Sequence, residues 1–408
     1  MNLSSKSWYK WFILVIFWIN FFLNAGSWLF PLSIKYDIMF NGFFLTDIER
    51  SLLLTLPMVG LIMVAFFSGL IIDKLGIHKS AIISFTIIII FGFLRGLSMN
   101  FIMLSLFSII FGFGIGINLA LPVKLISEWF LENEYSTSHG LIVMASGFGI
   151  FFFELINKPL FYENLYPIFG DITWRVNFFI YSCFSLIALI LWIIFSQERK
   201  DKINIKRNSV SLTNGIKEVI KNRQIWLLCI INISALSSYF GAKHFLSEIL
   251  GIQGIDSSNI FMIISVLSLG AMFGNVIVSK ISDLLQKRKF FILEGITFIG
   301  IFLIITGLTT NIILIELIFL FLLGFSIGTV IPLISAMVII NMKKEHVSTA
   351  MGFVIFFGNL GALLIPNFFE VIVNAELGYL IAIFIISIIS FIGSISSLFL
   401  KEPKQTKI

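Results

Sequence analysis

The chain has 408 residues, of which 58% are hydrophobic and only 12% are charged, and its formal net charge is +6. A soluble domain carries about twice that share of charged residues, so the composition excludes an ordinary soluble protein and indicates an all-α membrane protein. The two cysteines, Cys183 and Cys229, both lie inside apolar runs, which argues against a disulfide framework or a metal site.

Apolar runs of about 20 residues are long enough to cross a bilayer as helices. The sequence predicts twelve such spans, at 11–34, 51–72, 80–97, 101–126, 137–157, 174–195, 225–246, 258–278, 290–308, 311–340, 347–373 and 377–400. The first span is longer than the core of a signal peptide, which is about 7–15 residues, and we expect it to be retained. Residues 98–100 and 309–310 are links so short that they predict tight helical hairpins.

Lysine and arginine gather in the loops on one side of the predicted bundle, together with both ends of the chain. Cytoplasmic loops of membrane proteins carry an excess of these residues. We therefore expect a multi-pass protein of the plasma membrane with both termini in the cytoplasm. The positive net charge is explained by this bias and does not indicate a nucleic-acid partner.

Residues 197–224 form the one long polar stretch of the sequence. This stretch predicts a division into a six-helix bundle at 1–196, a central cytoplasmic loop at 197–224 and a second six-helix bundle at 225–408. Within the loop, Ile216, Val219 and Ile220 share one helical face, which is typical of a surface helix lying on a membrane. A flexible linker is the alternative.

The two predicted bundles resemble each other along the sequence. Residues of the first half recur about 210 positions later: Asn20 with Asn232, Asp73 with Asp283, Gly112 and Gly116 with Gly324 and Gly328, and Ser136 and Thr137 with Ser348 and Thr349. Both halves also begin on the same side, so they are parallel repeats. In such folds the substrate site lies between the halves near the middle of the membrane, and the halves rock about it.

A short charged loop between the second and third spans carries a known pattern: a glycine, an aspartate and a basic residue, a second glycine, and a further basic residue. The residues that fill it are Gly69, Asp73, Lys74, Gly76 and Lys79, with Asp283 in a degraded second copy. This loop resembles the signature loop of the major facilitator superfamily. The resemblance implies twelve helices in two parallel repeats of six, secondary active transport by alternating access, and a latch formed by these residues in the outward-facing state.

Within that superfamily, three further motifs are similar to the nitrate/nitrite, cyanate and organic-anion branches. They are Trp129-Phe130, Trp174-Arg175 and the Gly358-Asn359-Leu360-Gly361 run. Nitrate porters carry a central arginine on the second and eighth spans, and those spans contain no arginine or lysine here. The resemblance therefore implies a small organic or inorganic anion other than nitrate as the transported solute.

Ionisable residues inside a membrane are costly and mark candidate sites. Lys243 and His244 lie in the outer third of the seventh span, where we expect an anion contact. Arg95 and Glu154 lie near the outer ends of the third and fifth spans and are a candidate charge pair for coupling. The alternative for Arg95 is snorkelling to the interface, and for Lys243 and His244 it is an interfacial position around a helix end. Glu154 could pair with Arg95 or take a proton.

Asparagines lie on several spans, of which the first, fourth and seventh line the cavity in the family that this chain resembles. Asn20 and Asn24 share a stripe on the first span, Asn118 lies on the fourth, Asn232 on the seventh and Asn359 on the eleventh. We expect these side chains to contact substrate. Interhelical hydrogen bonding is the alternative.

The leading prediction is a secondary transporter that moves a small solute with a proton or another co-ion, as a monomer in the bilayer. No phosphate-binding G-x-x-x-x-G-K-[ST] loop is present, so ATP is not expected to drive it, and no cofactor is expected. An exporter of amphipathic compounds is an alternative that suits the 47 phenylalanines. A membrane enzyme is disfavoured because the four histidines show no metal or nucleophile spacing, and a receptor or scaffold is a further alternative.

Overall fold

The computed structural model describes residues 8–33, 47–157, 164–196, 212–255, 257–309, 313–372 and 378–402. Across these ranges all regular structure is helical, and twelve helices are long and apolar enough to cross a membrane. The all-α membrane fold with twelve spans is therefore confirmed.

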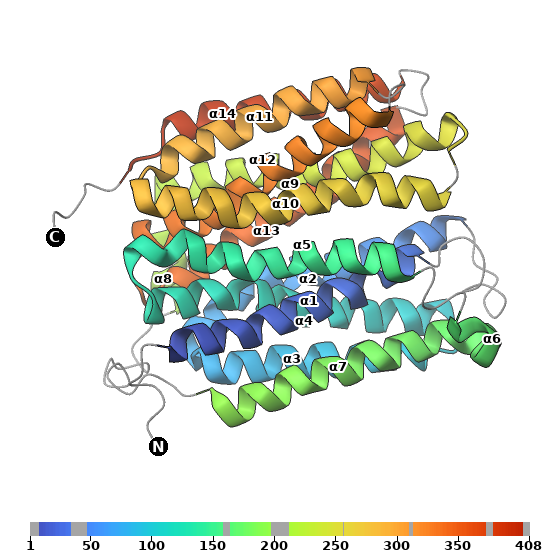
Figure 1. The fold of residues 1–408 in the computed structure, drawn as a ribbon. Coiled ribbons are helices and arrows are strands. Elements are labelled where there is room, and N and C mark those ends of the chain that lie inside the picture. Colours follow the sequence, from blue (N-terminus) through green and yellow to red (C-terminus); the bar gives the residue numbers. More distant parts are fainter. Residues whose placement is uncertain are drawn as a thin grey trace.

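Two bundles of six long helices lie side by side (Figure 1). The first contains α1 (Tyr9–Ser33), α2 (Asp47–Leu75), α3 (Ile77–Gly96), α4 (Phe101–Trp129), α5 (Tyr135–Asn157) and α7 (Thr173–Phe195), with the short α6 (Tyr166–Phe169) before α7. The second contains α9 (Arg223–Ile252), α10 (Ser257–Leu285), α11 (Arg288–Thr309), α12 (Ile313–Asn341), α13 (Val347–Ile372) and α14 (Tyr379–Leu398). α8 (Leu212–Lys221) precedes the second bundle.

The two ends of the bundles differ in the helix ends and short helices that lie at them. α1 begins and α14 ends at the same end, where α8 also lies, and α6 lies at the other (Figure 1). We call these the terminal end and the opposite end. Several helices extend past their predicted limits. At α9 a polar cap accounts for the difference, because the Asn222 side chain accepts a hydrogen bond from Gln224 N and the helix begins two residues early.

Glycines set the closest helix contacts inside each bundle, and they do so in the same way in both. At Gly112 on α4, a Cβ atom would collide with the carbonyl oxygen of Pro57 on α2. At Gly324 on α12, a Cβ atom would collide with the carbonyl oxygen of Leu267 on α10. Helix backbones approach this closely in membranes only where side chains are missing. The repeated glycines of the sequence therefore build the same helix pair twice.

The described part of the central loop forms the helix α8, while the position of that helix on a membrane surface stays a prediction. Val219 of α8 is 1% exposed, and Gly215 lies against the imidazole of His346 at the start of α13. Lys343 Nζ donates a 2.8 Å hydrogen bond to Glu218 Oε1. α8 is thus docked on the terminal end of the second bundle through its own side chains.

Candidate functional site: polar contacts between and within the bundles

A buried aspartate at the end of α2 reaches across to the second bundle. Asp73 Oδ2 accepts hydrogen bonds from Thr349 N at 2.9 Å and from Thr349 Oγ1 at 2.7 Å. Thr349 lies in the first turn of α13, where backbone N–H groups have no partner within the helix and the helix dipole is positive. Asp73 therefore caps a helix of the other bundle.

A lysine from the first bundle completes this first cross-bundle contact. Lys124 Nζ on α4 lies 3.0 Å from Asp73 Oδ1 and donates a 2.7 Å hydrogen bond to the carbonyl oxygen of Lys344. The side chain of Asp73 is 1% exposed and that of Lys124 is 9% exposed. Removing one member of a buried pair like this costs about 3–5 kcal/mol, because the other charge stays buried.

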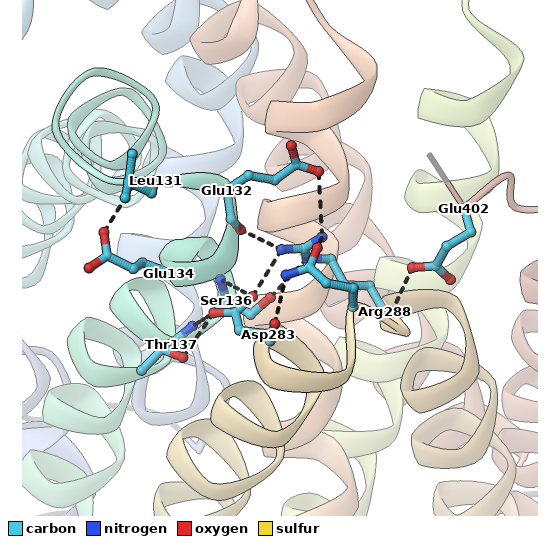
Figure 2. A network of polar contacts seen from close by, with 9 residues as sticks. Leu131, Glu132, Glu134, Ser136, Thr137, Asp283, Arg288 and Glu402 are labelled. Atoms are coloured by element: carbon cyan, nitrogen blue, oxygen red, sulfur yellow. Dashed lines mark hydrogen bonds and ion pairs between the residues drawn. The ribbon is translucent and has the colours of Figure 1, made fainter. Parts of the chain in front are cut away.

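The same contact recurs with the bundles exchanged (Figure 2). Asp283 at the end of α10 accepts hydrogen bonds from Thr137 N at 2.7 Å and Thr137 Oγ1 at 2.8 Å, at the start of α5. Arg288 takes the place of the lysine, with its Nη2 atom 3.0 Å from Asp283 Oδ1. Arg288 also reaches the first bundle, donating to the carbonyl oxygen of Glu132 at 2.5 Å and to Ser136 Oγ at 3.3 Å. This second cross-bundle contact is buried, since Arg288 is 0% exposed.

The segment that follows α14 is joined to the second cross-bundle contact. Glu402 accepts hydrogen bonds from the backbone N–H groups of Arg288 at 2.8 Å and Lys289 at 2.9 Å, and thereby caps α11 (Figure 2). Lys401 N donates to Gln224 Oε1 at 2.8 Å, at the start of α9. The C-terminal segment thus fixes the helix start from which Arg288 projects.

Glycines allow the two bundles to touch just beyond these contacts. A Cβ atom on Gly140 of α5 would collide with the carbonyl oxygen of Asn275 on α10. A Cβ atom on Gly352 of α13 would lie 2.5 Å from the carbonyl oxygen of Ala65 on α2. The terminal end of the molecule is therefore closed by two related helix pairs, each with an aspartate contact at its edge.

The signature loop is only part of this arrangement. Gly69 lies against the backbone of Ser348, and Gly76 turns the chain into α3 with a φ of 81°, a conformation that favours glycine. Lys74 and Lys79 are exposed, and the cation that meets Asp73 is Lys124. Sequence reasoning missed Lys124 and Arg288 as partners. The repeated Ser-Thr pairs that begin α5 and α13 were the available signal, since they mark the helix starts that the aspartates cap.

Three of the predicted asparagines meet inside the first bundle. Asn20 Oδ1 accepts hydrogen bonds from Asn24 Nδ2 at 2.8 Å and from Asn118 Nδ2 at 2.7 Å. All three side chains are buried. Among the described residues, Asn20 Nδ2, Asn24 Oδ1 and Asn118 Oδ1 have no partner. The asparagine triad therefore leaves one donor and two acceptors unused.

The remaining two asparagines are used within the second bundle. Asn232 Nδ2 donates to the carbonyl oxygen of Val354 on α13 at 3.0 Å and fills the space beside Gly358. Asn359 Nδ2 donates to the carbonyl oxygen of Ile355 in its own helix at 2.9 Å. The structure does not bring Asn232 into the asparagine triad, and its contact is an interhelical hydrogen bond.

Arg95 is buried at the opposite end of the first bundle. Its guanidinium carbon lies 4.3 Å from the ring centre of Phe178 and 4.8 Å from that of Phe111, and its Nη1 atom donates to the carbonyl oxygen of Ser27 at 3.1 Å. That carbonyl lacks its usual partner because Pro31, four residues later, has no N–H group. The side chain of Glu154, the predicted partner of Arg95, lies outside the described residues.

Lys243 and His244 are half-buried in the part of α9 that leads to the opposite end. Lys243 Nζ lies 5.2 Å from the ring centre of Tyr239, and the His244 ring lies 5.0 Å from that of Phe245. Each residue thus borders an aromatic side chain. Arg95 and Lys243 place cationic groups toward the same end of the two bundles.

Comparisons with known proteins agree with this architecture. The family model described as Major Facilitator Superfamily matches residues 16–366 and 232–408. The E. coli fucose:proton symporter is similar in structure, with a TM-score of 0.77, 12% identity, and coverage of 95% of this chain and 98% of that one. A human organic anion transporter has a TM-score of 0.74, 13% identity, and coverage of 95% and 99%. An uncharacterised protein of Archaeoglobus fulgidus is 20% identical over 191 residues, covering 47% of this chain and 86% of that protein.

Proposed function

This chain belongs to the Major Facilitator Superfamily and is a secondary transporter rather than an enzyme, and we propose that it moves a small organic or inorganic anion by alternating access. The observation that carries the mechanism is the pair of cross-bundle contacts around Asp73 and Asp283. Both hold the bundles together at one end only. In each, an ion pair within one bundle is joined to hydrogen bonds that cross to the other bundle and separate when the bundles part. They are the latches of the state closed at the terminal end.

We place the terminal end in the cytoplasm of a cell with the protein in its plasma membrane, following the positive charge of that side. The closed state is then outward-facing. In this proposal the two bundles are residues 1–196 and 225–408, and the loop at 197–224 joins them. The protein acts as a monomer. A proton or another co-ion accompanies the solute, as the name of the fucose:proton symporter says of that protein.

Cationic groups support the choice of an anion. Arg95 and Lys243 lie toward the opposite end, one in each bundle, and the human relative is named as an organic anion transporter. The unused donor of Asn20 and the imidazole of His244 add hydrogen-bonding groups for the oxygen atoms of a carboxylate or oxyanion. In this proposal an anion enters from the opposite end, passes these groups and is released when the latches open.

A thermal-stability screen of the purified protein tests the anion. A ligand at about 100 times its dissociation constant stabilises the folded state by about 2.7 kcal/mol, which raises the melting temperature measurably. We expect stabilisation by small carboxylates or inorganic anions, and its loss in Lys243→Ala. Lys280→Ala, which removes an exposed lysine near the terminal end, is the matched control and should keep the response. Stabilisation by uncharged sugars alone would contradict the anion.

One observation favours a second candidate, export of amphipathic compounds. A cluster of aromatic rings joins α1 to α5, with Trp18 stacked on Phe22 at 5.6 Å and Phe22 next to Phe148 at 5.5 Å and Phe152 at 5.5 Å. These side chains are only partly buried. In the same screen, stabilisation by lipophilic cations and not by anions would support this candidate over the first.

A further inference from the structure

A carboxyl group without any partner is buried near the start of α12. Glu316 is 0% exposed, and neither of its carboxylate oxygens has a hydrogen-bond partner among the described residues. Asp73 and Asp283 are the other buried carboxylates that the structure describes. Each of them contacts a cationic side chain and the first turn of a helix in the other bundle. Glu316 differs from both, and it lies at the opposite end.

The repeat shows that the fold does not need a carboxyl group at this place. An offset of 212 residues relates Gly112 to Gly324. The same offset relates Leu104 on α4 to Glu316. Leu104 is 1% exposed and packs with Trp174 and Phe153. An apolar side chain therefore satisfies the equivalent position, and the acid in α12 adds a chemical property rather than a packing contact.

Few titratable groups surround the outer part of α12. The helices that contact it are α4, α5, α9, α10, α11 and α13. Toward the opposite end, the titratable residues on α9 are Tyr239, Lys243, His244 and Glu248. The described parts of α4, α10 and α11 carry no titratable residue at that end. The side chains of Glu154 on α5 and Glu370 on α13 lie outside the described residues. None of the four on α9 bonds to Glu316.

An ionised carboxylate without a partner is costly to bury in such surroundings, and such a group takes up a proton and becomes neutral instead. We propose that Glu316 binds the proton that this transporter couples to its solute. The proposal rests on the transporter function proposed above. In the state closed at the terminal end, Glu316 carries the proton on its carboxyl group. When the O–H bond breaks, the proton passes to water and the carboxylate remains on α12.

α12 is placed to connect that event with the movement of the bundles. It contacts α5 and α4 of the first bundle as well as its own neighbours. Parting the bundles therefore changes the surroundings of α12. A charge that is tolerated only in one arrangement shifts the equilibrium toward that arrangement.

Infrared difference spectroscopy of the full chain in liposomes tests the proton directly. We expect the carboxylic-acid C=O band of Glu316 to disappear on going from acidic to alkaline buffer in the wild type. The band should be missing in Glu316→Gln and retained in Glu294→Gln, which removes an exposed carboxylate from the neighbouring α11. A spectrum of Glu316→Gln that matches the wild type would overturn the proposal.

Thermal melting against pH gives a second readout. If the folded protein keeps a proton that the unfolded chain has released, the melting temperature of the wild type falls as pH rises. Glu316→Leu, which copies Leu104, should remove that fall and leave the protein folded. Equal pH slopes for the two proteins would overturn the proposal. Neither measurement needs a substrate, so a proton band without any stabilisation by anions would contradict the anion and leave the proton site standing.

Discussion

Neutralising Asp73 should open the terminal end. In the structure its carboxylate accepts two hydrogen bonds from Thr349 of the other bundle and one from Lys124. Asparagine has the same shape but no charge, and hydrogen bonds to charged groups are about twice as strong as neutral ones. If each of the two cross-bundle bonds loses about 1 kcal/mol, the closed state loses about 2 kcal/mol relative to the open one. That corresponds to an increase of about 30-fold in the ratio of open to closed protein.

A cysteine in the interface measures this ratio. Ser279 on α10 is 0% exposed and its Oγ atom faces Gly140 of the other bundle, so it is protected while the terminal end is closed. Ser279→Cys is made in a Cys183→Ser background, because Cys183 is exposed and Cys229 is buried. When opening and closing are fast, the rate of labelling by an impermeant maleimide follows the open fraction. We expect Asp73→Asn to raise that rate by about 10- to 100-fold.

A matched variant separates the latch from a general charge effect. Glu345→Gln removes one negative charge from the exposed loop that precedes α13 and should leave the labelling rate unchanged. If Asp73→Asn labels no faster than the wild type while its melting temperature shows it to be folded, the aspartate does not hold the bundles together. The reasoning from the cross-bundle hydrogen bonds would then be refuted.

Three further predictions concern the cap of α11, the glycine contact between the bundles and the docking of α8. Glu402→Ala removes the cap of α11 and should cost about 1 kcal/mol of stability, seen as a lower melting temperature. Gly140→Val places a side chain where the bundles touch, so the same cysteine assay should report an open terminal end, whereas a valine at the exposed Gly251, where a Cβ atom meets no close neighbour, should not. The hydrogen bond from Lys343 lowers the pKa of the Glu218 carboxyl group. The ionised Glu218 therefore stabilises the docking of α8 above the normal glutamate pKa, and this stabilisation is lost as pH falls through the lowered pKa. Protease cleavage in α8 should therefore increase in acid, and Glu218→Gln should show the increased cleavage at neutral pH already.

Much of the architecture could be predicted because it depends on local properties of the sequence. Span length follows from runs of apolar residues, and the repeat follows from matched glycines, serines and threonines at a constant offset. The central helix at 212–221 was one of two alternatives, since its apolar residues share a face while the rest of the loop is polar. The signature loop pointed correctly to the family, because its glycines and aspartate are close together in the sequence.

Partners across helices were not predictable in the same way. Helices such as α4 and α12 are apolar on all sides, so no amphipathic pattern states which face meets which neighbour. Sequence reasoning therefore left Lys124 and Arg288 without their partners and grouped Asn232 with Asn20. The sequence by itself determined the number, length and repetition of the spans. Only the tertiary structure decided how each helix is rotated, because that depends on the close glycine contacts and buried hydrogen bonds of the assembled bundles.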